Sequence, residues 1–480
     1  MREGLEMRKD VYTNSITKIL TEMFMGIIIL TILVSCINNS SEMEGYEEDA
    51  NDIIDTSGDI SSPICFDKAS YLFERLDVLL DADDGYLWGI NLHGPVVIVD
   101  ELTRYAVANM PDEREIFSRQ GDLYVGRLPE ETIMGVTASE FGGRLWGMVT
   151  WGFIENEGFI DSEEVDSIVH ITDTMLHELF HARQHLFFEG ELGGYPPSHL
   201  NNLDARINLR LELNVLLHAL RTTGEDRRLA VADALSIRAE RHRLYPDDIQ
   251  AENLFEASEG TAVYTEAILG RDNLADRIAL LEIYRNHEDL SLIYFYYTGA
   301  AYALLLDEFS IEWREGIRWD TDLAEILGEG IGFTEVTPFN EIDIENYGYL
   351  EIRSLEEAWV AENERLIGEA EDALSGSLLF LDTEGEFDFF SESVDIRILD
   401  LEQDRTVFYG DFTYTTHYGK LELTGGFLQL WSGMGQHAIS ASDMEVDGNR
   451  IITPNWVLTL NEGYRLREFA AVHFGIAEQD

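Results

Sequence analysis

Apolar residues recur at intervals of three and four positions through most of the segment 162–310, the spacing that gives a helix one buried face. The clearest run covers residues 165–188, and two further helical patterns follow at 202–222 and 225–242. Apolar side chains mark the face of the first run at Ile168, Ile171, Met175, Leu176, Leu179 and Phe180. We therefore expect the segment to be almost wholly helical.

The segment before these helices has a different pattern. Residues 65–82 have helical spacing, whereas residues 86–151 contain short apolar runs between turn residues. The runs 96–100 and 104–109 predict a hairpin, and 145–151 predicts another strand. A β-sheet is therefore expected immediately before the helical segment.

The last hundred residues again favour strands. A charged helical pattern at 354–374 is followed by short apolar runs, separated by pairs such as Gly410-Asp411 and Gly425-Gly426 that predict turns. We expect an α+β protein. A mainly helical domain with a preceding sheet would cover residues 63–375, and an all-β domain of sandwich or barrel type would cover residues 376–480.

The first 35 residues have the features of a targeting segment. Basic residues precede an apolar stretch at 23–34, which is short for a membrane span. Leu33-Val34-Ser35 before Cys36 resembles the lipobox of bacterial lipoproteins, in which the cysteine becomes acylated. The resemblance implies a lipid anchor in the bacterial cell envelope. The resemblance also favours the outer membrane or the cell surface, because Ile37 follows the cysteine. The alternative is a signal anchor retained as one helix.

The residues after the lipobox are acidic and poor in apolar side chains. Residues 36–62 therefore predict a disordered tether between the anchor and the folded domains. If Cys36 is acylated, Cys65 is the remaining cysteine, and no intrachain disulfide is expected.

The whole chain is strongly acidic, with a formal net charge of −59 over 480 residues. Such a charge disfavours binding to nucleic acid. The chain has four lysines, and its acidic residues are spread along its whole length, a composition that resembles proteins of salt-adapted organisms. A field that steers cationic peptides is the competing interpretation.

The most informative motif is His177-Glu178-Leu179-Phe180-His181, which has the form HExxH. Residues four apart share one face of a helix, so His177 and His181 can both direct an imidazole at one Zn²⁺ ion. Glu178 is offset by about 100° and can reach a water on that metal as a general base. HExxH is the signature of zinc metallopeptidases.

A third metal ligand is expected downstream, because catalytic zinc usually has three protein ligands and one open position. Glu259 begins a Glu-Gly-x-Ala segment on an expected helix. With HExxH, this segment resembles the gluzincin metallopeptidases, the thermolysin-like and aminopeptidase N-like group, in which a later glutamate completes the zinc site. The resemblance implies a zincin-like domain with Glu259 as ligand. Glu256, one turn earlier, is the fallback.

A further match lies at Tyr296-Tyr297-Thr298-Gly299-Ala300. It resembles the Tyr-x-x-Gly-Ala segment of aminopeptidase N-like enzymes, in which the tyrosine stabilises the oxyanion beside the zinc. The resemblance implies this role for Tyr296, and a phenol donor suits a developing negative charge. The alternative is core packing, because Tyr296 belongs to an aromatic cluster.

The chain also departs from these families. The separation of His181 and Glu259 is far longer than in the aminopeptidases. No Gly-x-Met-Glu-Asn segment precedes the motif, and residues 134–138 read Met-Gly-Val-Thr-Ala instead. Because aminopeptidases use that segment to hold the substrate's amino terminus, exopeptidase action has no support.

Several other polar residues are candidates for parts of a site. Glu266 lies about two turns after Glu259 and can orient a ligand histidine, but we interpret it as an exposed helical acid. Arg206 and Arg210 share a helix face and can bind a substrate carboxylate, although pairing with the chain's many acids is the commoner outcome.

Three hypotheses follow for function. The first is a zinc-dependent peptidase of the cell envelope that acts on a peptide or protein substrate. The second is a catalytically inactive, peptidase-fold lipoprotein that binds a partner or has a structural role in the envelope. The third is a helical lipoprotein in which HExxH occurs by chance.

Overall fold

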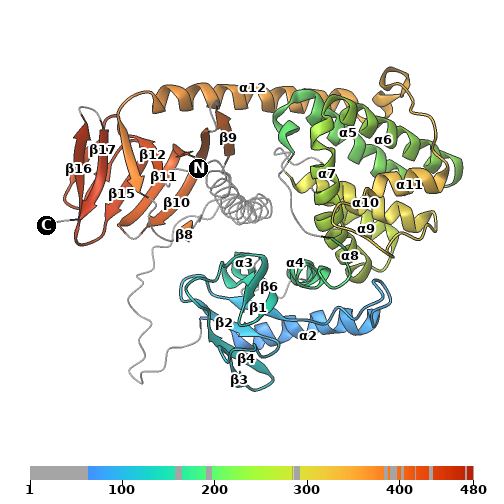
Figure 1. The fold of residues 1–480 in the computed structure, drawn as a ribbon, viewed down its shortest axis with the longest axis horizontal. Coiled ribbons are helices and arrows are strands. Elements are labelled where there is room, and N and C mark those ends of the chain that lie inside the picture. The colour runs from blue at the N-terminus through green and yellow to red at the C-terminus, as the bar shows by residue number, and fades with distance from the viewer. Residues whose placement is uncertain are drawn as a thin grey trace, which may run out of the picture. The chain divides into compact units, whose positions relative to one another are not determined.

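The computed structural model describes residues 63–156, 165–190, 197–283, 285, 292–382, 388–389, 397–401, 405–416, 418–431, 436–470 and 473–478. The expected signal segment, the acidic tether and Cys36 lie outside these residues. The described chain divides into two compact units, one formed by the residues up to Glu356 and the other by those from Glu357 onward (Figure 1).

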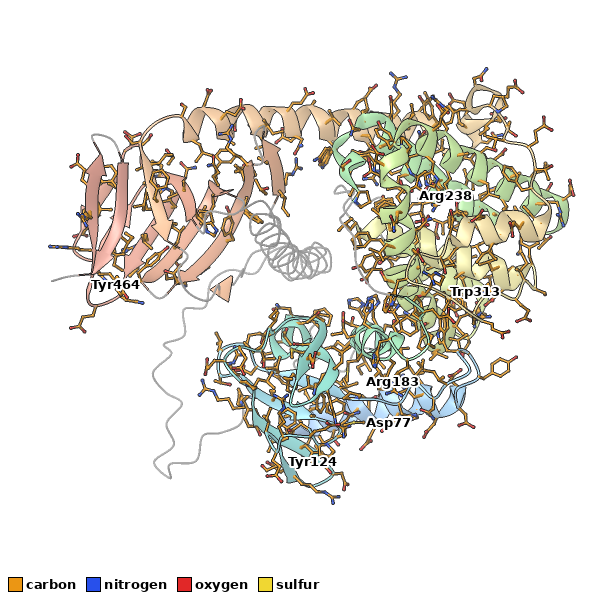
Figure 2. The ribbon with its side chains drawn as sticks, viewed as in Figure 1. Asp77, Tyr124, Arg183, Arg238, Trp313 and Tyr464 are labelled. Carbon is orange, nitrogen blue, oxygen red and sulfur yellow. The ribbon has the colours of Figure 1, made fainter. Side chains whose placement is uncertain are left out.

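The first unit contains a six-stranded sheet in the order β3-β4-β2-β1-β6-β5. Its strands are β1 (Val96–Val99), β2 (Tyr105–Ala108), β3 (Ser118–Gln120), β4 (Leu123–Arg127), β5 (Thr137–Phe141) and β6 (Arg144–Thr150). Strands β1 and β6 are parallel and the other neighbours are antiparallel, so the expected hairpin is confirmed as β1–β2. Trp146 and Phe141 lie in the sheet's apolar core, and Tyr124 packs against it (Figure 2).

The same unit contains most of the helices, and the expected helical segment is confirmed over its described residues. They are α2 (Phe66–Asp83), α3 (Trp151–Asn156), α4 (Val165–Gln184), α5 (Leu203–Arg221), α6 (Gly224–Leu244), α7 (Ile249–Phe255), the π-helical turn η3 (Glu256–Gly260), α8 (Thr261–Gly270), α9 (Leu274–Glu282), α10 (Ile293–Glu308) and α11 (Leu323–Ile331). Short 3₁₀ turns are η1 (Ser198–Asn201), η2 (Pro246–Asp248), η4 (Phe339–Glu341) and η5 (Ile344–Tyr347). Among the described helices, none combines the length and the apolar character that crossing a membrane requires.

The HExxH helix α4 lies directly against strand β6. Gly147 allows this approach, because a Cβ atom at that position would lie 2.6 Å from the backbone nitrogen of Leu179 and 2.7 Å from the carbonyl carbon of Glu178. The contact falls on the motif itself. The position of the motif relative to the sheet therefore depends on the missing side chain of Gly147.

The helix α12 (Tyr349–Leu374) contributes residues to both units, and its last turns pack on strands of the second unit through Leu366, Ala370 and Leu374. This second unit is rich in strands: β7 (Leu378–Asp382), β8 (Asp388–Phe389), β9 (Arg397–Leu401), β10 (Arg405–Thr416), β11 (Gly419–Trp431), β12 (Gln436–Ser440), β13 (Glu445–Asp447), β14 (Arg450–Ile452), β15 (Trp456–Leu460), β16 (Tyr464–Ala470) and β17 (His473–Glu478). They form one connected sheet that branches at β11, which pairs with β10, β12 and β15.

Two of the expected turns are wrong. Gly410-Asp411 and Gly425-Gly426 lie inside the long strands β10 and β11, where Gly410 pairs with Gly426 and the register shifts between Gly410 and Phe412. The Asp411 carboxylate accepts a hydrogen bond from the backbone nitrogen of Gly425 at 2.6 Å. The glycines therefore form a paired irregularity within the hairpin and do not end its strands.

Gly147→Ala should lower the free energy of unfolding of the first unit by about 1–3 kcal/mol, because the added methyl forces β6 and α4 apart. The matched control is Gly328→Ala in α11, whose added Cβ would meet its nearest atom, Cδ1 of Leu235, at an ordinary 3.4 Å. That control should be neutral or stabilising, since alanine favours a helix interior over glycine by about 0.5–1 kcal/mol. Denaturant titration measures both, and equal stabilities of Gly147→Ala and the wild type would refute the close-contact account.

Candidate metal centre

The helix α4 presents the motif residues at a buried position between the sheet and the later helices. Its contacts on one side are with β6 and β5, and on the other side with α8. His177 and Glu178 are buried, and His181 is half-buried. The four-residue spacing places both imidazoles on one helix face, with their rings 4.7 Å apart at their centroids.

Glu259 reaches the histidines from the π-helical turn η3. A π turn inserts an extra residue in the helical ladder and is frequent at functional sites. The turn packs tightly on α10, because a Cβ atom on Gly260 would lie 2.6 Å from the Cα atom of Gly299. The glycine of the Glu-Gly-x-Ala segment and the glycine of the Tyr-x-x-Gly-Ala segment are thus in direct backbone contact.

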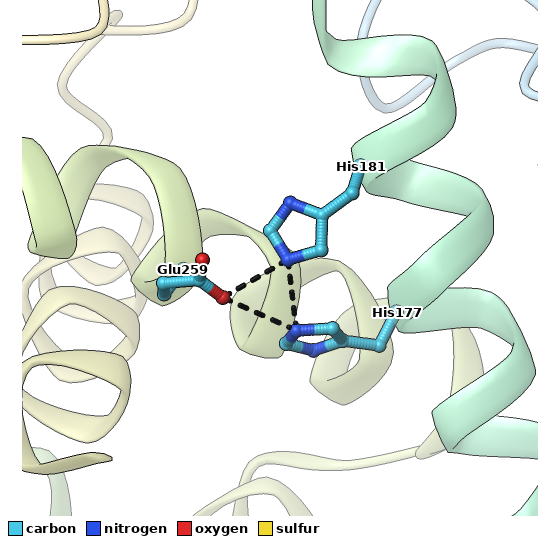
Figure 3. A group of neighbouring side chains, drawn as sticks. All are labelled: His177, His181 and Glu259. Carbon is cyan, nitrogen blue, oxygen red and sulfur yellow. Dashed lines mark hydrogen bonds and ion pairs between the residues drawn. The ribbon is translucent and has the colours of Figure 1, made fainter. Parts of the chain in front are cut away.

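Three ligand atoms meet between these elements (Figure 3). The Nε2 atoms of His177 and His181 are 3.0 Å apart, and Oε2 of Glu259 lies 3.4 Å from the first and 2.9 Å from the second. Among the described residues, these three form the one cluster of histidine, cysteine or acidic side chains whose atoms converge in this way. The fallback residue Glu256 is buried elsewhere and is not part of it.

Gln184 fixes the tautomer of His181. Its side-chain amide nitrogen donates to the carbonyl oxygen of Ser258 at 2.7 Å, so its amide oxygen faces Nδ1 of His181 at 2.9 Å. An amide oxygen can only accept, so the Nδ1 atom of His181 carries the proton and Nε2 keeps its lone pair. The sequence interpretation missed Gln184, although it lies three residues after His181 on the same helix.

Glu266 does the same for His177. Its buried carboxylate on α8 contacts Nδ1 of His177, so the neutral form of this imidazole also has its lone pair on Nε2. The interpretation of Glu266 as an exposed acid is wrong, and the orienting role considered beside it agrees with the contact. His177 and Glu266 are 89 positions apart in the chain, and only the packing of α8 on α4 brings them together.

The resulting centre has three acceptors and needs a positive charge. Burial alone would lower the pKa values of both histidines, but nearby carboxylates outweigh it: Glu266 raises the pKa of His177 well above its ordinary value, and Glu259 raises that of His181. Burial likewise opposes ionisation of Glu259, yet His181 and His177 lower its pKa. A proton or a metal cation can satisfy such a group of atoms.

The donor set fits Zn²⁺. Ligand distances of 2.0–2.2 Å in a tetrahedral zinc site imply ligand atoms about 3.3–3.6 Å apart. The observed separation of 3.4 Å lies in that range, and those of 2.9 and 3.0 Å are a few tenths of an ångström shorter. Two imidazole nitrogens and one carboxylate also form a set typical of catalytic zinc. The residues present therefore fit the metal that the sequence predicts.

Two further predicted residues lie at the centre. Burial raises the pKa of Glu178 to about 7, although His177 and His181 oppose the shift. The ring of Tyr296 stacks on that of His177 with centroids 5.9 Å apart and planes 7° from parallel. Burial, and then the charge of Glu259, raise the pKa of the Tyr296 phenol well above its ordinary value, so it remains a hydrogen-bond donor.

Other polar residues lie apart from the triad. Arg206 and Arg210 both pair with the buried Glu356 at the start of α12, which agrees with pairing to an acid over binding of a substrate carboxylate. His185 is exposed immediately after the end of α4. Comparison of the chain with protein-family models, curated proteins and solved structures gives no match.

Replacement of Gln184 by methionine should lower zinc affinity by about tenfold or more, because outer partners of ligand histidines contribute 10–100-fold. Methionine keeps the length of the side chain and removes the group that holds the Nδ1 proton of His181. The matched control is His185→Gln, one residue further on and exposed, which should leave zinc affinity unchanged. Competition with a chromogenic chelator measures both, and an unchanged affinity in Gln184→Met would refute the orienting role.

Proposed function

We propose that this protein is a zinc-dependent peptidase, with His177, His181 and Glu259 as the metal ligands. The observation that carries the proposal is the buried triad of converging acceptors with Glu178 and Tyr296 beside it. A structural zinc site usually has four protein ligands, whereas a catalytic site has three and leaves one position open. A three-ligand site with an adjacent carboxylate therefore supports hydrolysis over a structural role.

Each side chain has a distinct part in the proposed reaction. Zinc, when bound, lowers the pKa of a coordinated water toward neutrality and polarises a carbonyl group. Glu178 accepts the proton of the attacking water and delivers it to the leaving amine. The phenol of Tyr296 donates a hydrogen bond to the peptide carbonyl oxygen as negative charge develops there.

Strand β5 is suited to hold the substrate backbone. Within the described residues it is an edge strand that pairs with β6 alone, and it also packs against α4. An edge strand presents unpaired backbone groups, which can extend the sheet by pairing with an added peptide. We propose that a peptide or protein substrate binds along β5. In the gluzincins that the sequence resembles, the substrate backbone pairs with an edge strand in the same way.

Two variants separate catalysis from metal binding. Glu178→Gln should leave about one zinc per chain bound. Its rate of peptide hydrolysis should fall by about a hundredfold or more, the usual contribution of a general base. Glu259→Gln should weaken zinc retention itself, because a charged ligand is lost. Metal analysis and cleavage of a peptide library provide the two measurements.

Hydrolysis by Glu178→Gln at the wild-type rate would exclude Glu178 as the base. Zinc binding without cleavage of any library peptide would favour the inactive, partner-binding lipoprotein. Absence of zinc from the wild type would leave HExxH as a chance motif.

Activity should be lost as the pH falls, because Glu178 must be deprotonated to act. Without metal the pKa of Glu178 is about 7. A bound cation favours the carboxylate and lowers this value. The acid limb of kcat/KM should therefore have its midpoint at or below about pH 7. A midpoint well above pH 8 in the zinc-loaded wild type would contradict this assignment.

We also propose a location in the bacterial cell envelope, which rests on the sequence around Cys36. Cys36→Ser should abolish acylation and release the protein from membranes, since stable anchoring depends on the lipid chains. Radiolabelled palmitate incorporation and fractionation after a high-salt wash test this. Continued sedimentation of Cys36→Ser with membranes would point to the signal anchor instead.

A further inference from the structure

A buried ionic cluster lies beside the turn that carries Glu259 and takes no part in the proposed chemistry. Its centre is Arg238 of α6 (Figure 2), which reaches Glu256 of η3. Arg238, Glu256 and Thr298 are all buried. Burying a guanidinium and a carboxylate is costly unless good geometry and further hydrogen bonds offset the loss of water.

Hydrogen bonds from Arg238 and Thr298 hold the carboxylate of Glu256 in one orientation. Nη1 of Arg238 donates to Oε1 of Glu256 at 2.9 Å, and Nη2 donates to Oε2 at 2.7 Å, so the pair is bidentate. The hydroxyl of Thr298 donates to the same Oε1 at 2.7 Å. Both carboxylate oxygens are therefore held, and Glu256 cannot rotate without breaking charged hydrogen bonds.

The cluster connects the two segments that form the metal centre. Glu256 lies three residues before Glu259 in the same π turn, and Thr298 lies two residues after Tyr296 on α10. The turn and the helix also touch through their backbones, since a Cβ atom on Gly299 would lie 2.5 Å from the carbonyl oxygen of Glu256. A shift of the turn would therefore move Glu259 relative to the histidines of α4.

We propose that Arg238, Glu256 and Thr298 are positioning residues that lock the π turn, so that Glu259 meets His177 and His181 in metal-binding geometry. This inference rests on the proposed metal function. A cluster that only stabilised the fold would contribute equally with and without metal. A positioning cluster must change metal affinity and coordination beyond its effect on stability.

The sharpest test compares Thr298→Val with Thr298→Ser in the full-length protein. Valine keeps the shape and removes the hydroxyl that holds Glu256, whereas serine retains it. Thr298→Val should bind Zn²⁺ several-fold more weakly than the wild type, less than the roughly tenfold loss for a direct partner of a ligand, because Thr298 acts on Glu259 through Glu256. Its Co²⁺ complex should have altered visible absorption bands, and Thr298→Ser should restore both properties.

A second pair tests the guanidinium. Arg238→Met should weaken zinc binding at least as much as Thr298→Val, because it removes both charged contacts to Glu256. Arg206→Met removes another buried guanidinium, whose carboxylate partner Glu356 belongs to α12. It should lower the thermal midpoint and leave zinc affinity within about twofold, because it lies outside the partners that orient the ligands. If Arg238→Met does not fold, the Thr298 pair decides.

The outcomes are separable. A wild type that binds no zinc or cobalt overturns the metal function and the positioning role together. A wild type that binds zinc, with Thr298→Val identical to Thr298→Ser in affinity and cobalt spectrum, overturns the positioning role alone. Loss of affinity that follows the thermal midpoint equally in all variants, Arg206→Met included, also overturns it.

Discussion

Three hydrogen-bond acceptors face one another in the interior of the first unit. The protons of His177 and His181 are held on Nδ1 by Glu266 and Gln184, so the Nε2 lone pairs point toward each other and toward the carboxylate of Glu259. Such an arrangement repels itself unless a proton or a metal cation lies among the three atoms. The proposal of a metal centre follows from this requirement together with the fit of the donor set to zinc.

The rest of the unit can be understood as the framework that brings these atoms together. His181 and Glu259 are 78 residues apart in the chain, and the helices α5 and α6 fill much of that interval. The missing side chain of Gly147 lets α4 lie on the sheet, and the contact of Gly260 with Gly299 lets the π turn lie on α10. Backbone contacts of this kind fix distances more firmly than flexible side chains can.

Much of this arrangement could be predicted from the sequence, because helical and strand periodicity are local signals. The spacing of His177 and His181 predicted a shared face, and the structure brings Glu259 to it. Contacts that arise only when distant segments pack together could not be predicted in this way. Glu266 resembled any other acid in an acidic chain, and Gln184 carried no motif of its own.

The glycine pairs of the second unit illustrate the same limit. Gly410-Asp411 and Gly425-Gly426 have turn composition, but each lies opposite the other across a long hairpin. Pairing with a neighbouring strand decided their conformation, and that pairing cannot be read from a single segment. The wrong interpretations therefore share one cause, since each depended on a partner distant in the sequence.

X-ray absorption at the zinc edge of the purified full-length protein tests the central claim most directly. We predict one zinc per chain. Its ligands should be two imidazole nitrogens at about 2.0–2.1 Å and oxygen atoms at about 2.0–2.2 Å, with no sulfur. A folded protein that takes up no zinc, or a zinc spectrum without imidazole nitrogen, would contradict it.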